Sequence, residues 1–163
     1  MVSGLPGTGK SHFCGKLAER LPFLILESDA LRKTLFSIPS YNRQESSRLF
    51  QTIHLLIDRL LRKGISLILD ATNLSERYRE RLYSIAERVD VKLILVRVEA
   101  PPEVVQERLK NRRGEREAKS DADWAVYERM KPTVQKIRRN HYVVDTSKDI
   151  TPVLDKIARE TSR

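Results

Sequence analysis

The chain has few of the residues that mark secreted, membrane-spanning or zinc-stabilised proteins. It holds one cysteine among 163 residues, so no internal disulfide can form, and this fits a reducing cytoplasm. No apolar run approaches the ~18 residues that a membrane span needs, and the glycine-rich start takes the place of a signal peptide's apolar region. The three histidines show no ligand spacing. We therefore expect a cytoplasmic protein with neither a membrane nor a zinc partner.

Acidic residues are fewer than lysines and arginines, and the formal net charge at pH 7 is +9. A basic surplus favours polyanionic partners such as phosphates or nucleic acid, although an arginine-rich but ordinary surface would give the same total. The length allows a sizeable core, and no linker or repeat interrupts residues 1–163, so we expect one domain. The sequence carries no signal for the oligomeric state.

Short apolar runs alternate with helical patterns along the whole chain, which is typical of the β-α-β order of a parallel sheet. The runs expected to form strands are residues 1–3, 23–26, 65–69, 91–98 and 141–144. Because several of these runs are almost continuously apolar, they suit a sheet that helices cover on both faces. The pattern predicts an α/β fold.

Local signals predict where several helices begin and end. Gly64 is expected just past the end of a long helix, and Ser75 is a candidate N-cap of the next one. Pro102 suits the first turn of a later helix. Ser120 is a candidate N-cap of a further helix, which Pro132 ends or kinks.

The first eleven residues contain the phosphate-binding pattern G-x-x-x-x-G-K-S. Its glycines let backbone N–H groups converge on a phosphate, and the helix that follows offers its N-terminus to negative charge. Lys10 is expected to reach the β- and γ-phosphates of ATP, and the Ser11 hydroxyl to bind Mg²⁺. The pattern does not distinguish ATP from GTP. The predicted nucleotide-binding residues here are Gly4, Pro6, Gly7, Thr8, Gly9, Lys10, Ser11 and His12.

Two aspartates follow the second and third expected strands, at the sheet edge where ligands of parallel α/β proteins bind. One carboxylate, Asp29, can accept the proton of an attacking hydroxyl, while Asp70 can hold Mg²⁺ together with Ser11. Alternatively, Asp29 caps the short helix expected over residues 30–36, and Asp70 is a turn residue without chemistry. Arg32 lies three residues after Asp29, so both can face one side of the helix, with Arg32 binding a phosphate.

A basic segment begins at Arg108 and ends at Lys119, with six basic residues against two acidic ones. Gly114 interrupts it and offers a hinge. An arginine-rich flap that folds over the triphosphate would neutralise charge developing during phosphoryl transfer. A solvated basic loop is the alternative.

Four motifs, "GLPGTGKS", "SDALRK", "LDATN" and "RLKNRRGEREAKSDA", together resemble the AAA-type P-loop kinases of the zeta-toxin and polynucleotide-kinase family. The resemblance spans residues 1–147. It implies a three-layer, nucleotide-kinase-like P-loop NTPase with a five-stranded parallel sheet in the order 2-3-1-4-5, and an arginine-rich lid at about residues 108–120. It also implies that Asp29 is the general base and that Arg32 binds an acceptor phosphate. The lid arginines are then Arg112, which would also bind the nucleotide, and Arg116.

These features predict an ATP-dependent kinase that phosphorylates an acceptor hydroxyl. The basic balance and the stretch "RMKPTVQKIRRNH" favour the 5′-hydroxyl of a nucleic acid, DNA or RNA. The family also contains kinases of antibiotics, sugars and nucleotides, so a small-molecule acceptor stays open. The loop at residues 37–48 is expected to face the acceptor. A GTP switch is less favoured because no Asn-Lys-x-Asp element occurs, and a non-transferring ATP-binding module is the remaining alternative.

Overall fold

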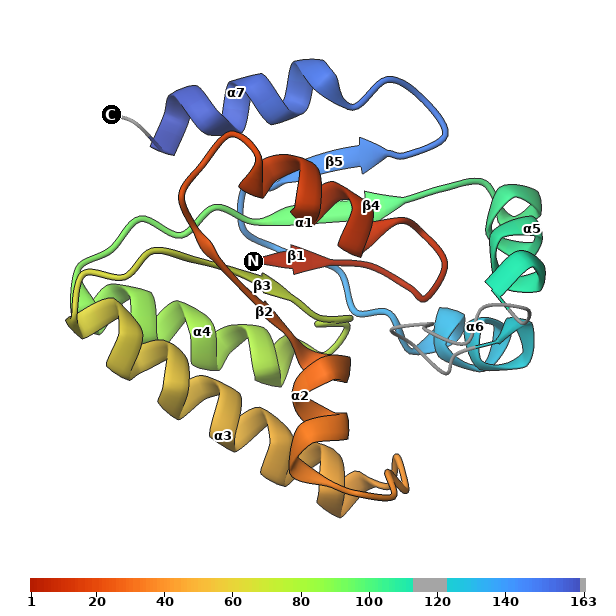
Figure 1. Ribbon diagram of the computed structural model, residues 1–163, viewed down its shortest axis with the longest axis horizontal. Helices are drawn as coiled ribbons and strands as arrows, with labels where there is room; N and C mark the ends of the chain where they lie inside the picture. The colour runs from red at the N-terminus through yellow and green to blue at the C-terminus, as the bar shows by residue number, and fades with distance from the viewer. Residues whose placement is uncertain (113–122, 162–163) are drawn as a thin grey trace.

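Five strands form one parallel sheet in the structure, a computed structural model that describes residues 1–112 and 123–161 (Figure 1). The strand order is β2-β3-β1-β4-β5, as predicted. The strands are β1 (Val2–Ser3), β2 (Leu24–Glu27), β3 (Leu67–Asp70), β4 (Val96–Glu99) and β5 (Tyr142–Asp145). This confirms the α/β fold class and a sheet consistent with a three-layer P-loop NTPase.

Helices cover both faces of this sheet, with α1 and α7 on one side and α3 and α4 on the other (Figure 1). The helices are α1 (Lys10–Ala18), α2 (Ser28–Leu35), α3 (Arg43–Arg62), α4 (Glu76–Val89), α5 (Pro102–Arg112), α6 (Trp124–Met130) and α7 (Thr151–Thr161). One apolar cluster joins Phe13 and Leu154 to the first face, and another joins Leu49 and Leu82 to the second. The sheet is therefore apolar on both faces because both are covered.

The four longer strands reach one residue further than the apolar runs predicted, and each ends on a carboxylate residue. Glu27 pairs with Asp70, and Glu99 pairs with Asp145, in the parallel register. Backbone pairing continues past the last apolar side chain because a strand's hydrogen bonds do not depend on side-chain polarity. The start of β4 moves from residue 91 to Val96, since the Val91 N–H bonds back to the Ala86 carbonyl at the end of α4.

Most of the helix signals are confirmed. Gly64 follows α3 with φ +73°, and Pro102 opens α5. Ser75 is the N-cap residue of α4, although its side chain makes no capping hydrogen bond. The N-cap of α6 is Asp123, whose carboxylate accepts from the Val126 N–H at 3.0 Å, while Ser120 lies outside the described residues.

Three further sequence features are Pro132, the single cysteine and the lack of a long apolar run. A 3₁₀ turn at Lys131–Thr133, which contains Pro132, follows α6 directly. The single cysteine, Cys14, lies on α1 and is buried in the core cluster between that helix and the sheet. In the described part of the chain, no helix combines the length and apolarity needed to cross a membrane.

Candidate active site

The loop between β1 and α1 packs so closely against the sheet that two of its glycines tolerate no side chain. A Cβ at Gly4 would lie 2.4 Å from the Val98 carbonyl oxygen, which belongs to a strand and cannot move aside. Gly9 is the N-cap of α1 with φ +93°, where an L side chain is strained, and its Cβ would lie 3.0 Å from Thr146 Oγ1. Since the first N–H groups of a helix have no intrahelical partner, the loop and the start of α1 form a cradle of backbone N–H groups that suits an anion.

Three polar side chains from this cradle and the neighbouring strand converge at one point. Ser11 Oγ donates to Asp70 Oδ2 at 2.6 Å, and Lys10 Nζ donates to the Leu5 carbonyl at 3.1 Å. Burial lowers the pKa of Lys10, against the opposing effect of Asp70 and Asp29. Burial likewise raises the pKa of Asp70, although the Ser11 hydrogen bond and the Lys10 charge oppose it. The predicted partners of Mg²⁺, Ser11 and Asp70, are therefore adjacent.

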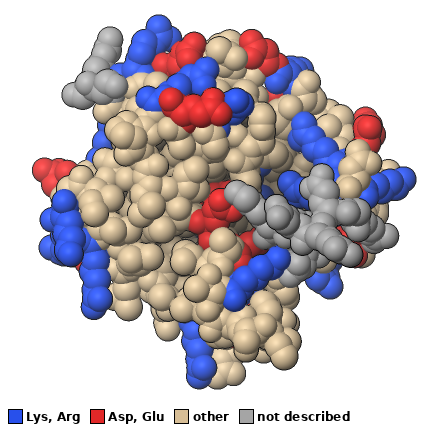
Figure 2. Space-filling model, viewed as in Figure 1, with Lys and Arg blue, Asp and Glu red and all other residues tan. Residues whose placement is uncertain are grey.

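Asp29 lies close enough to this group to act on it electrostatically. It sits in the first turn of α2, directly after β2, and its charge contributes to the pKa of both Lys10 and Asp70. The N-cap of α2 is Glu27, so the alternative in which Asp29 caps this helix is wrong. Acidic side chains appear at the centre of the face viewed in Figure 2. The three predicted residues Lys10, Asp29 and Asp70 thus share one edge of the sheet.

Arg32 makes a contact that the sequence did not indicate. Its guanidinium is buried, forms an ion pair with the Glu45 carboxylate at the start of α3, and donates to Ser46 Oγ at 3.2 Å. It also lies over the Tyr41 ring, 4.8 Å from the centroid. The structure therefore uses Arg32 to join α2 to α3, and its contact with an acceptor phosphate stays a prediction.

Glu45 organises the segment that leads into α3. Its carboxylate accepts from Ser40 N, Ser40 Oγ and Tyr41 N as well as from Arg32. Burial alone would raise the pKa of Glu45, but these hydrogen bonds outweigh it and hold the pKa at about 2. Because α3 begins at Arg43 with Asn42 as its N-cap, the irregular part of the predicted acceptor-facing loop is only residues 37–42.

Replacing Glu45 with glutamine is expected to lower the Tm by roughly 5 °C or more, because it leaves the buried Arg32 charge without a counterion. Thermal unfolding followed by circular dichroism measures this change. Glu80→Gln removes a carboxylate from the exposed side of α4 and serves as the matched control. Equal melting temperatures for the two variants would contradict the assigned role of the pair.

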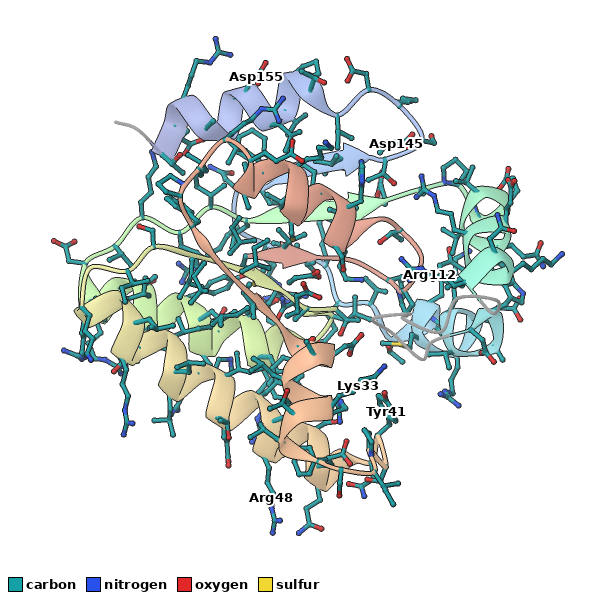
Figure 3. The ribbon with its side chains drawn as sticks, viewed as in Figure 1. Lys33, Tyr41, Arg48, Arg112, Asp145 and Asp155 are labelled. Atoms are coloured by element: carbon teal, nitrogen blue, oxygen red, sulfur yellow. The ribbon has the colours of Figure 1, made fainter. Side chains whose placement is uncertain are left out.

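Two arginines of α5 lie near the phosphate-binding loop. Arg112, the last residue of α5, contributes to lowering the pKa of Lys10, and Figure 3 labels it beside the loop that precedes α1. Arg108 donates to Thr146 Oγ1 at 2.8 Å, and that hydroxyl donates to the Thr8 carbonyl at 2.6 Å. Arg116 and most of the expected lid, 108–120, lie outside the described residues. Sequence reasoning missed the Arg108–Thr146 link, although Arg108 begins the basic segment that it singled out.

An aromatic cluster lies between α3 and α4. The rings of Phe50 and Tyr78 stack with centroids 4.4 Å apart, and the ring of His54 lies 6.2 Å from Phe50. His54 Nε2 is buried and has no hydrogen-bond partner among the described residues. Burial, with a smaller contribution from the Arg81 charge, lowers the pKa of His54 to about 4.

This buried histidine is expected to make the free energy of unfolding depend on pH. Between pH 6.5 and about 4 the unfolded chain protonates His54 while the folded chain does not, so stability falls as the pH falls. The full effect is about 3 kcal/mol, reached once the pH is below both pKa values. Urea unfolding at pH 7, 5.5 and 4 should show a smaller loss in His54→Gln than in the wild type, and equal losses would contradict this assignment.

Solved structures with the same fold include P-loop proteins that bind nucleotides. Kti12 of Chaetomium thermophilum, in complex with ADP-AlF3, is 22% identical, with a TM-score of 0.74 over 96% of this chain and 95% of its own. A gluconokinase from Sinorhizobium meliloti is 20% identical, with a TM-score of 0.68 over 99% and 90%. The APS kinase of Mycobacterium tuberculosis, in complex with AMPPNP and APS, is 14% identical, with a TM-score of 0.71 over 99% and 95%.

These similarities establish the fold of P-loop kinases but do not single out the zeta-toxin and polynucleotide-kinase type. No curated protein matches the chain. The AAA domain family matches residues 1–137, a span that contains the phosphate-binding loop, Asp29, Asp70 and α6. Because this match covers most of the 163 residues, the chain belongs to the AAA domain family.

Proposed function

We propose that the protein is an ATP-dependent kinase that transfers the γ-phosphoryl group to a hydroxyl of a small molecule. The observation that carries this proposal is the convergence of Lys10, the Ser11–Asp70 hydrogen bond and Asp29 at one sheet edge. A gluconokinase and an APS kinase share the fold, which favours the small-molecule acceptor over the nucleic-acid 5′ end. The entire chain, residues 1–163, would act as one kinase domain.

Nucleotide binding would use the loop and the first turn of α1. The backbone N–H groups from Gly7 to Ser11 would donate to phosphate oxygens, and the Lys10 ammonium would neutralise the β- and γ-phosphates. Pro6 and Thr8 shape the loop, and Thr8 Oγ1 donates to the Leu5 carbonyl at 2.7 Å. Ser11 and Asp70 present two oxygens 2.6 Å apart, a donor set that suits Mg²⁺. The ion would lower the charge on the phosphates.

The transfer step forms one P–O bond, breaks another and moves one proton. The acceptor hydroxyl oxygen attacks the γ-phosphorus, the bond from that phosphorus to the oxygen bridging the β-phosphate breaks, and ADP leaves. The proton of the hydroxyl goes to the Asp29 carboxylate. Arg112, and Arg116 from the undescribed segment, would stabilise the charge on the transferred group, while Arg108 holds Thr146 against the loop.

Transfer of labelled phosphate from ATP and Mg²⁺ tests this proposal. The acceptors are a panel of small hydroxyl compounds and, side by side, 5′-hydroxyl DNA and RNA oligonucleotides. Label on a small molecule that Asp29→Ala abolishes supports the proposal. Label on an oligonucleotide end instead would support the nucleic-acid kinase that the net charge of +9 favours. ATP binding without transfer to any acceptor would support the non-transferring module.

A further inference from the structure

Beside the proposed reaction centre lies a cavity of about 340 Å³, within the size range of small-molecule sites. Its described lining comes from α3 (Phe50), from residues 72–75 and Tyr78 around the start of α4, and from the segment that ends α6 (Met130, Thr133 and Gln135). We call it the acceptor pocket. On the basis of the proposed function, we infer that it binds an uncharged acceptor with an apolar ring face and neutral hydroxyl groups.

The wall of the acceptor pocket is tied directly to the phosphate-binding loop. The Thr72 carbonyl accepts from the Gly4 N–H at 3.1 Å and from Ser3 Oγ at 2.8 Å. Thr72 also follows Asp70 by two residues, and Asp70 is hydrogen-bonded to Ser11. A molecule in this pocket therefore sits one short loop away from the residues that hold the phosphates.

None of the side chains that line the pocket in the described part of the chain is ionised. A buried anion without a counter-charge is costly, so an acceptor that carries a carboxylate or phosphate needs a cation in the wall. The buried arginines of α2 and α4 are each paired with a carboxylate. Arg32 pairs with Glu45, and Arg79 pairs with Glu76 while also donating to the Asn73 carbonyl at 2.7 Å. The pocket thus favours a neutral molecule.

The same lining explains the expected shape of the acceptor. Phe50 is buried and stacks on the ring of Tyr78 with an interplanar angle of 19°, so it fixes the half-buried Tyr78 ring at the pocket wall. Met130 adds an adaptable apolar side chain, while the hydroxyl of Thr133 and the amide of Gln135 offer neutral polar groups. Aromatic walls with a few uncharged polar groups suit a ring that is apolar on its face and hydroxylated at its edge.

Matched pairs of acceptors test the charge preference. The wild-type protein is assayed for ATP-dependent phosphorylation of glucose against gluconate, and of uridine against uridine monophosphate. The uncharged member of at least one pair should have the higher kcat/KM by about tenfold or more. A preference for the anionic members, or ATP consumption that no uncharged member stimulates, overturns the inference. Protein that consumes no more ATP than Lys10→Ala with every acceptor would instead overturn the proposed function.

A charge placed at the pocket wall gives an independent test. Thr133 is exposed, so Thr133→Glu and Thr133→Gln should both fold and differ only in charge. With the acceptor that the panel selects, the KM values of the two variants should agree within about twofold, because an uncharged molecule has no net attraction to a carboxylate. A KM about tenfold higher in Thr133→Glu would overturn the inference.

A second variant pair tests the ring contact. Tyr78→Ala removes half of the aromatic wall and should raise the acceptor KM by about tenfold, whereas Tyr78→Phe keeps the ring and should leave it nearly unchanged. The KM for ATP should stay the same in both variants, since Tyr78 lines the acceptor pocket and is not part of the phosphate-binding loop. Equal acceptor KM values in Tyr78→Ala and Tyr78→Phe would overturn the stacking role.

Discussion

Replacing Lys10 with alanine is expected to lower phosphoryl transfer by about 10³–10⁴-fold and to weaken ATP binding as well. Lys10 is the one cation that the cradle itself supplies, and its ammonium lies against the Leu5 carbonyl of the same loop. Lys10 is half-buried, and burial lowers the pKa of its ammonium. Phosphate oxygens would gain more from it there than from a solvated lysine.

Steady-state turnover and ATP titration measure the two effects of this change. Lys16→Ala is the matched control, because Lys16 lies on the same helix and pairs at the surface with Glu19. The control should keep turnover within about twofold, as expected for a surface pair. Turnover that Lys10→Ala leaves intact would show that this loop does not serve phosphoryl transfer.

Replacing Asp29 with asparagine or alanine is expected to lower kcat by about 10²–10⁴-fold while leaving the affinity for ATP within about twofold. The reason is geometric. Asp29 lies in the first turn of α2, just after β2 and near Asp70 and Lys10, but it is not part of the phosphate-binding loop. A base that touches the acceptor alone affects the transfer step and not nucleotide binding.

Single-turnover kinetics measure the effect of the Asp29 variants on the transfer step, and ATP titration measures their effect on nucleotide binding. Asp155→Asn makes the same chemical change on α7, away from the site, and should have no effect (Figure 3). If Asp29→Ala loses ATP affinity as severely as Lys10→Ala, then Asp29 contributes to binding the nucleotide or its metal ion, and another group must accept the proton.

The local sequence alone determined the parts of this protein that depend on near neighbours. The phosphate-binding loop follows from glycine and lysine spacing, because its backbone geometry is set by the eight adjacent residues of the pattern, 4–11. The α/β class follows from the alternation of apolar runs and helical patterns, and resemblance supplied the strand order that the structure confirms. Asp70 could be placed beside Ser11 because Asp70 ends β3 and Ser11 follows β1 after one loop. The C-terminal ends of these parallel strands share one edge of the sheet.

Only the tertiary structure decided contacts between elements that are distant along the chain. Arg32 is paired with Glu45 because α2 and α3 cross at that point, and no local periodicity encodes where two helices meet. Arg108 reaches Thr146 across 38 residues for the same reason. The acceptor pocket likewise combines α3, α4 and the segment after α6. Which side chains face the acceptor depends on how these helices pack, and packing follows from the sum of many weak apolar contacts that no short motif contains.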